Sequence, residues 1–378
     1  MTGWHDALER LADARAKAGL TRRLRPRPAG DFVVDLAGND YLGLAAHPAV
    51  IEASAAALRA YGLGATGSRL VRGSTEAHAE LESALAGWLG SAAALVFSSG
   101  YLANIAAIRG LGAVCDLVVS DRFNHASLID GCRMSGLETV VAPHNDPAAV
   151  GAVLDAHPGR RAMVVTESVF SVDGDLAPLA ALHEVTSARD AVLLVDDAHA
   201  LGVLGRSGSG GVAAAGLAGR PDVVVTATLS KSLGGAGGFV AGPEPFVRHL
   251  VDTGRTFIYD TAPPPAVVAG VHAALRIARA ADDRRALLAA RGGLIADRLR
   301  AAGFRVSPPA AGVLSVVAPG PESALAWAAD CRDRGVAVGC FRPPSTPDGT
   351  SRLRLTLNAG VSDADFARAL DVVVECAP

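Results

Sequence analysis

The sequence predicts an α/β protein in which helices cover both faces of a mostly parallel β-sheet. Between about residues 49 and 242, helical segments alternate with short apolar runs of Val, Leu and Ala. Strands that are buried on both faces have such continuous apolar runs, whereas half-exposed strands alternate apolar and polar residues. The length of 378 residues also exceeds that of an average domain, so we expect a second domain.

The first predicted element is a charged amphipathic helix at residues 1–19.

Polar or small residues follow each predicted strand, and ligands of open parallel sheets bind beyond the carboxyl ends of the strands. We therefore expect these polar residues to share one crevice. The runs are ALVFSSG (94–100), DLVVSD (116–121), TVVAPHND (139–146), AMVVTESVFS (162–171), AVLLVDDAH (191–199) and DVVVTATLSK (222–231).

A smaller α+β domain is predicted after a proline-rich break at 261–266. We expect one long helix from about 266 to 302 and two later helices near 322–334 and 362–375. The predicted regions are an N-terminal helical and arm segment (1–45), a large domain (46–276) and a small C-terminal domain (277–378).

In the predicted strand SRLRLTLN (351–358), alternation places Arg352 and Arg354 on the same face. Two guanidinium groups therefore point the same way.

The charge balance does not favour a nucleic acid or an anionic membrane as a partner. The formal net charge is -3, whereas proteins that bind polyanions carry a basic surface. No apolar run reaches the length of a membrane span, and the N-terminus lacks the apolar core of a signal peptide. We therefore predict a cytoplasmic protein.

The five cysteines form no C-x-x-C pair, so we expect neither a disulfide framework nor a metal site.

A nucleotide-binding loop is disfavoured by its context. Gly62, Gly64 and Gly67 match the spacing G-x-G-x-x-G, but the preceding segment, residues 50–60, has a helical pattern. A dinucleotide fingerprint must instead follow a strand and open a helix. Neither lysine follows a glycine, which excludes a G-x-x-x-x-G-K-[ST] phosphate loop.

Lys231 is the first candidate for a catalytic residue. Only two of the 35 basic residues are lysines, Lys17 and Lys231, and Lys231 lies in the apolar and glycine-rich segment 223–238. Lysine can lose its proton and form a Schiff base with a carbonyl, whereas arginine stays charged. From composition alone, an ordinary surface lysine is an equal alternative.

The surrounding strand ends supply the groups that pyridoxal phosphate (PLP) needs. Asp196 could hold the proton of the pyridine nitrogen, and His199 could reach the phenolic oxygen. The segment 97–104 offers backbone amides at a helix start for the phosphate, and His125 could stack on the ring. In isolation, Asp196 could be a helix cap, the segment 97–104 a strand-to-helix turn, and His125 a capping or surface histidine.

An ordered set of motifs resembles the PLP-dependent α-oxoamine synthases over nearly the whole chain. The Arg-Pro-Pro run at 342–344 and the arginine-rich segment 20–28 resemble the members that act in biotin biosynthesis. The motifs are NDYLGL (39–44), GATGSRLVRGSTEAHAELE (64–82), FSSGYLAN (97–104), NHASLIDG (124–131), TESVFSVDGDLAPL (166–179), VDDAHALGVLG (195–205), TLSKSLGG (228–235) and FRPPSTPDGTSRLRLTL (341–357).

The resemblance implies the fold-type I architecture of aspartate aminotransferase, with a mostly parallel seven-stranded sheet and a smaller α+β C-terminal domain. It also implies a homodimer whose active site lies at the subunit interface. The implied catalytic residues are Lys231, His125 and Asp196; the cofactor-binding residues are Ser99, Gly100, Tyr101, Glu167, Ser171, Asp196, His199, Thr228, Lys231 and Thr261; the substrate-binding residues are Arg22, with Arg23 as the alternative, Asn39, His125, Ser345 and Arg354.

The implied activity is that of an acyltransferase that condenses L-alanine with a pimeloyl thioester and releases carbon dioxide. Lys231 would remove the α-proton, and Arg354 would hold the amino-acid carboxylate. The acyl carrier could be coenzyme A or a carrier protein. The alternative within the family joins glycine to an acetyl or succinyl thioester of coenzyme A. Outside the family, the alternatives are a nucleotide-dependent oxidoreductase and a non-catalytic binding protein.

Overall fold

The computed structural model describes residues 3–18, 20–22, 24–343, 346 and 348–378. The chain separates into two compact units, one up to Val33 and one from Val34 onward. The N-terminal unit contains the predicted first helix, α1 (Gly3–Lys17), none of whose described residues is buried. The domain boundaries that we place after residues 45 and 276 stay predictions.

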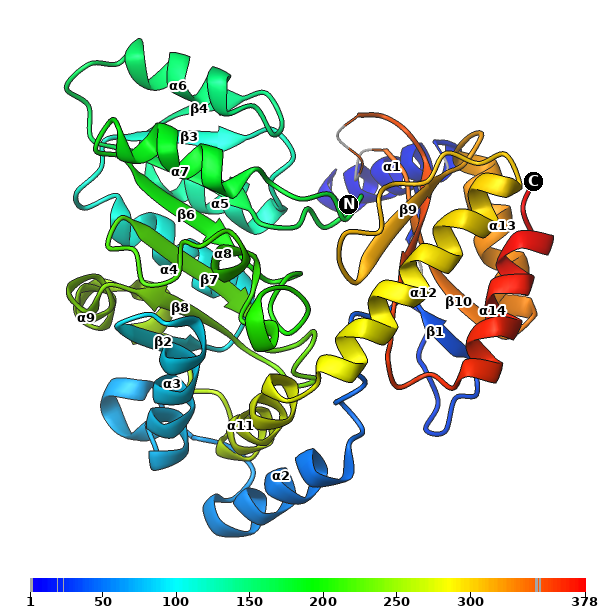
Figure 1. Ribbon diagram of the computed structural model, residues 1–378, viewed down its shortest axis with the longest axis horizontal. Helices are drawn as coiled ribbons and strands as arrows, with labels where there is room; N and C mark the ends of the chain where they lie inside the picture. Colours follow the sequence, from blue (N-terminus) through cyan, green and yellow to red (C-terminus); the bar gives the residue numbers. More distant parts are fainter. Residues whose placement is uncertain (1–2, 19, 23, 344–345, 347) are drawn as a thin grey trace. The chain divides into compact units, whose positions relative to one another are not determined.

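Seven strands of the described chain form the larger sheet in the order β2-β8-β7-β6-β5-β3-β4 (Figure 1). Strand β8 is antiparallel to both β2 and β7, whereas the other pairs of described strands in this sheet are parallel, so the predicted mostly parallel sheet is confirmed. Its strands are β2 (Ala93–Phe97), β3 (Leu117–Asp121), β4 (Glu138–Ala142), β5 (Ala162–Glu167), β6 (Val192–Asp196), β7 (Val223–Thr228) and β8 (Gly238–Gly242).

Both faces of the central strands of this sheet are buried, which explains their continuous apolar runs, whereas the edge strand β4 is largely exposed. In β6, Leu193 and Val195 pack into one apolar cluster, whereas Leu194 between them packs into another. Helices on opposite faces of the sheet contribute further side chains to the two clusters. These helices are α2 (Pro48–Tyr61), α3 (Glu76–Leu89), α4 (Gly100–Leu111), α5 (Ala126–Ser135), α6 (Pro147–Asp155), α7 (Leu179–Ser187), α8 (Gly211–Ala214), α9 (Glu244–Thr253), α10 (Arg255–Ile258) and α11 (Pro265–Arg279).

The smaller sheet contains four described strands in the order β1-β10-β11-β9. Its edge strand β1 comes from the N-terminal end of the second unit and pairs in parallel with β10, with Val34 opposite Val336. Helices α12, α13 and α14 lie beside these strands in Figure 1. The bounds are β1 (Val34–Leu36), β9 (Val313–Val317), β10 (Val336–Phe341), β11 (Arg352–Thr356), α12 (Asp282–Ala301), α13 (Pro321–Asp333) and α14 (Asp363–Glu375).

The single long helix expected at 266–302 is wrong, because the structure has two helices there, α11 and α12. The chain leaves the helical conformation at Ala281, where φ is -90° and ψ is 45°. The guanidinium group of Arg285 then donates to the carbonyl oxygen of Ala278 at 2.6 Å. An arginine that caps the last carbonyls stabilises a helix end without glycine or proline.

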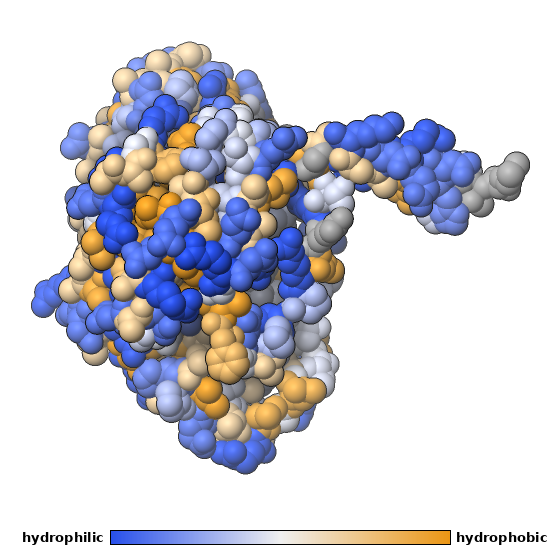
Figure 2. Space-filling model, turned by 90° about the vertical axis from the view of Figure 1, so that its right-hand side faces the viewer, coloured by the Kyte–Doolittle hydropathy of each residue, from blue (hydrophilic) through white to orange (hydrophobic). Residues whose placement is uncertain are grey.

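Hydrophilic and hydrophobic residues are mixed on the molecular face shown in Figure 2. Among the described helices, none combines the length and the apolar character that crossing a membrane requires.

Candidate active site

Polar residues that follow β2, β5, β6 and β7 meet at one cavity of about 260 Å³. The shared crevice predicted from the strand ends is therefore present. Nine of the predicted site residues line the cavity: Ser99, Gly100, Tyr101, His125, Glu167, Asp196, His199, Thr228 and Lys231.

Lys231 lies in this cavity with its amine 2.7 Å from Nε2 of His199. Burial lowers the pKa of Lys231 to about 8, although the carboxylates of Asp196 and Glu167 oppose this shift. Burial also holds the pKa of His199 well below its ordinary value, and the charge of Lys231 adds to the effect. His199 is therefore neutral at pH 7. Its second ring nitrogen, Nδ1, lies 2.5 Å from the hydroxyl of Tyr41.

Asp196 ends β6, and the buried side chain of Asn104 orients its carboxylate. The amide nitrogen of Asn104 donates to Oδ2 of Asp196 at 2.7 Å, and its oxygen accepts from Thr226 at 2.5 Å. Sequence reasoning assigned no role to Asn104. The available signal was one polar residue among apolar residues of α4, four positions after Gly100 and so on the same helix face.

The start of α4 provides an anion-binding arrangement. Ser99 is the N-cap residue, and its side chain and carbonyl oxygen accept the amides of Leu102 and Ala103. The amides of Gly100 and Tyr101 remain available at the cavity wall. A Cβ atom at Gly100 would lie 3.1 Å from Cβ of Thr228, so this position favours glycine.

Glu167 and His125 line the same cavity but differ in exposure. Glu167 is 2% exposed, and its Oε1 atom has no hydrogen-bond partner among the described residues. Burial and the nearby Asp196 charge raise the pKa of Glu167 well above its ordinary value. His125 is exposed, and its Nδ1 atom lies 2.7 Å from the hydroxyl of Ser127 at the start of α5. The His125 ring is therefore oriented by a local cap.

Arg354, Asn39 and Ser171 form a second group, outside the residues that line the cavity. The guanidinium group of Arg354 donates to the carbonyl oxygen of Ser171 at 2.9 Å and to Oδ1 of Asn39 at 3.2 Å. Asn39 is also 3.3 Å from the hydroxyl of Tyr41, which contacts His199. Hydrogen bonds through Tyr41 thus connect this group to the cavity.

Of the remaining predicted site residues, Thr261 does not line the cavity. Thr261 is exposed and forms an isolated β-bridge with Ser68. Arg22 belongs to the N-terminal unit, and its role in substrate binding stays a prediction. Ser345 and the alternative N-terminal arginine, Arg23, lie outside the described residues.

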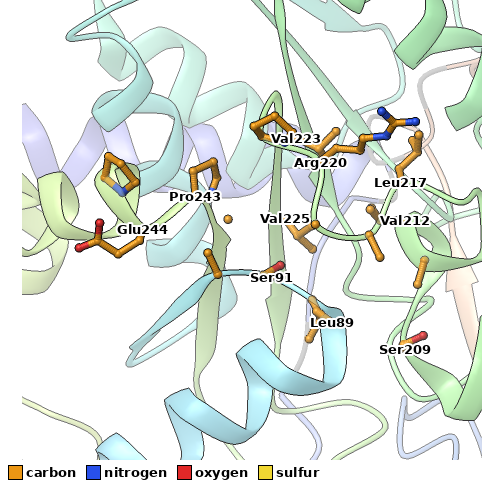
Figure 3. Close-up of a pocket in the computed structure, with 17 residues that line it drawn as sticks. Leu89, Ser91, Ser209, Val212, Leu217, Arg220, Val223, Val225, Pro243 and Glu244 are labelled. Atoms are coloured by element: carbon orange, nitrogen blue, oxygen red, sulfur yellow. The ribbon is translucent and has the colours of Figure 1, made fainter.

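A second cavity, of about 290 Å³, lacks a comparable combination of groups. Its described lining is mainly aliphatic and includes Leu89, Val212 and Leu217. In Figure 3, the charged ends of Arg220 and Glu244 point to opposite sides. We therefore assign the chemistry to the cavity at Lys231.

The residues of the Lys231 cavity fit PLP. They include an amine of lowered pKa in Lys231, a carboxylate held by Asn104 in Asp196, and free amides at the start of α4. The orphaned Oε1 atom of Glu167 further indicates that a polar group is accommodated nearby. A cofactor with a carbonyl, a ring nitrogen and a phosphate uses each of these features.

Comparisons with known proteins agree with this assignment. The model of the family "Aminotransferase class I and II" matches residues 32–373. An 8-amino-7-oxononanoate synthase from Mycolicibacterium paratuberculosis is 52% identical over 372 residues, which cover 98% of this chain and 96% of the relative.

Solved structures show the same similarity. A structure of serine palmitoyltransferase (SPT) with PLP has a TM-score of 0.91 and 30% identity, and the match covers 99% of this chain and 97% of that chain. The 8-amino-7-oxononanoate synthase of Francisella tularensis has a TM-score of 0.78 and 25% identity, with 91% and 97% covered. The chain therefore belongs to the aminotransferase class I and II family, within which it is a PLP-dependent acyltransferase of the α-oxoamine synthase group.

Proposed function

We propose that this protein condenses L-alanine with a pimeloyl thioester to give 8-amino-7-oxononanoate, carbon dioxide and the free thiol carrier, as a step of biotin biosynthesis. The observation that carries the proposal is the convergence of Lys231, Asp196 and the start of α4 on one cavity. The relative that is 52% identical bears the name of a synthase of this product.

Lys231 holds the cofactor and then moves a proton. When bound, PLP supplies an aldehyde for the lysine and a ring that accepts the electron pair released at the amino-acid α-carbon. A pKa of about 8 leaves part of the Lys231 amine neutral near pH 7, and only a neutral amine can attack a carbonyl or accept the α-proton. Nε2 of neutral His199 lies within hydrogen-bond distance of this amine, at 2.7 Å.

The other cavity residues hold the cofactor in place. Asp196, oriented by Asn104, would hold a proton on the pyridine nitrogen. The amides of Gly100 and Tyr101 at the cavity wall would bind the phosphate, and exposed His125 would cover the ring.

Arg354 binds the carboxylate of the amino acid. Arg354 is 8% exposed, and its Nε atom has no hydrogen-bond partner among the described residues. A planar guanidinium group with spare donors is suited to bidentate binding of a carboxylate. Asn39, 3.2 Å away, holds the orientation of Arg354.

The active protein is a homodimer in this proposal. Leu63 and Val71 are 83% and 84% exposed, and they flank the segment that forms a bridge with Thr261. Exposed aliphatic side chains that are close in sequence support a protein interface. Sedimentation velocity tests the assembly, since a monomer at assay concentration would contradict this part of the proposal.

A substrate screen tests the activity. The holoenzyme is assayed with L-alanine and glycine, each combined with pimeloyl, acetyl and succinyl thioesters on coenzyme A, and with pimeloyl-carrier protein. The proposal expects turnover with L-alanine and a pimeloyl thioester. A preference for glycine with an acetyl or succinyl thioester would contradict the proposal and favour the alternative activity within the family. The comparison of pimeloyl-coenzyme A with pimeloyl-carrier protein shows which of the two is the acyl donor.

A lysine pair tests the site. Lys231→Ala is expected to abolish both the yellow colour of the holoenzyme and turnover, since no other residue supplies this amine. Lys17→Arg, in the exposed helix α1, is the matched control and should leave turnover unchanged. Full turnover in Lys231→Ala would overturn the assignment.

A further inference from the structure

His144, between β4 and α6, lies between two carboxylates from different parts of the fold. Its Nδ1 atom is 2.9 Å from Oδ1 of Asp121, and its Nε2 atom is 2.8 Å from Oδ2 of Asp175. Ionised carboxylates only accept hydrogen bonds, so both ring nitrogens must carry hydrogen. Burial alone would lower the pKa of His144, but the two carboxylates outweigh it and raise the pKa to about 9. The ring is therefore a cation at pH 7.

Through Asp121, His144 is connected to the turn that carries His125. Oδ1 of Asp121 also accepts the amide of Phe123 at 2.8 Å. The Phe123 ring stacks on His144 with the ring centroids 4.4 Å apart. His125 follows two residues later and lines the cavity. The contacts of His144 thus position the turn that carries His125.

The Asp175 side leads to the loop 169–176, which a bridge between Val169 and Leu176 closes. Phe170 of this loop contacts the His144 ring edge-on, at 4.3 Å between centroids. The neutral rings of Phe123 and Phe170 and the charged groups of Asp121 and Asp175 are the neighbours that face the imidazole.

The tip of the loop 169–176 contacts the smaller sheet. The carbonyl oxygen of Ser171 accepts from Arg354 at 2.9 Å, and Asp173 forms an ion pair with Arg352. The backbone of Gly174 approaches β9 so closely that a Cβ atom there would lie 2.8 Å from the carbonyl carbon of Val313. If the loop shifts, β11 and Arg354 must therefore shift with it.

We propose that His144, as a protonated bridge between Asp121 and Asp175, is a positioning residue for amino-acid binding. It joins the turn of His125 to the loop that holds Arg354, and so it sets the position of the carboxylate-binding arginine relative to the cofactor-covering histidine. This inference rests on the proposed function of these two residues.

The first test measures amino-acid binding without the acyl substrate. His144→Gln keeps the approximate size of the side chain but cannot carry a charge. We expect the dissociation constant of the holoenzyme for L-alanine, followed by the absorbance change of the cofactor, to rise about tenfold, with kcat changed less than about threefold. His249→Gln, at a partly exposed histidine of α9, is the matched control and should change neither quantity.

The second test uses the apo-protein and needs no activity. The pKa of His144 in the folded protein, about 9, exceeds the ordinary value of 6.5. The stabilisation is therefore complete below about pH 6.5 and disappears as the pH rises through 9. His144→Gln should lower the midpoint of thermal unfolding by roughly 3 °C or more near pH 7. The difference from the wild type should shrink near pH 10.

These results separate the proposal from a merely structural role. A difference in unfolding midpoint that is equal at both pH values, or unchanged L-alanine binding, would overturn it. Asp175→Asn removes the other half of the ion pair and should weaken L-alanine binding in the same direction. Absent turnover with every thioester would defeat the proposed function, but the amino-acid binding and unfolding measurements would still decide the role of His144.

Discussion

Gly238→Ala tests whether the approach of β8 to α4 is required for cofactor binding. A Cβ atom at Gly238 would lie 2.7 Å from the carbonyl carbon of Ser99 and closer still to the backbone of Gly100. Carbon atoms normally stay about 3.5 to 4.0 Å apart, so the backbones must separate by about 1 Å. Gly238 is not among the residues of positive φ, so the whole effect is steric.

The displacement should occur at the start of α4. Strand β8 pairs with a neighbour on each side, with Gly238 opposite both Phe97 and Thr228. Moving β8 would break the sheet, whereas the first turn of α4 can shift outward. Overpacking of this kind costs about 1–3 kcal/mol of stability, and a misplacement of about 1 Å in a binding site can cost about 100-fold in function.

The assay is a titration of the apo-protein with PLP, followed by absorbance, combined with thermal unfolding. Gly238→Ala should bind PLP at least about tenfold more weakly and unfold at lower temperature. Gly87→Ala is the control, because its Cβ atom in α3 would meet nothing within 4 Å. Alanine there should raise stability by about 0.5–1 kcal/mol. Wild-type PLP affinity in Gly238→Ala would refute the phosphate site at the start of α4.

Two further predictions concern the base of the cavity. The rate at which the apo-protein recovers its yellow colour with PLP should rise with pH and level off above about pH 8, because the pKa of Lys231 is lowered to about 8. A rate that still rises above pH 10 would contradict this, because it would indicate a lysine of ordinary pKa. Asn104→Ala should lower the free energy of unfolding by about 2–3 kcal/mol, because Asp196 and Thr226 lose their partners; an unchanged denaturant midpoint would contradict the buried network.

The sequence predicts the large sheet and its ligand-binding edge because burial on both faces leaves a local signal. Strands such as β6 are continuously apolar and end in charged residues. Strand β8 was not predicted, since GFVAG between glycines resembles a loop, and its pairing depends on β2 and β7. The break between α11 and α12 was also missed, because Arg285 caps α11 from the following helix and no local residue marks the end.

The residues of the candidate site also fall into two groups, those with a local sequence signal and those without one. Lys231 and Asp196 were identifiable because their residue types are unusual in apolar runs and their motifs resemble a known family. Asn104, Tyr41 and His144 contact neighbours that are distant in the sequence; Tyr41 and His199, for example, are 158 positions apart. Their roles depend on tertiary contacts that no local pattern encodes.

The parallel pairing of β1 with β10 also affects how the chain can fold during synthesis. Residues 34–36 leave the ribosome early, but their partner strand at 336–341 is made roughly 300 residues later. The smaller sheet therefore cannot be completed until almost the whole protein has been translated, and a contact of such sequence separation carries a large loop-closure cost. Until then Arg354 has no complete sheet to hold it, so the larger sheet can form the Lys231 cavity well before the proposed carboxylate-binding site at Arg354 is in place.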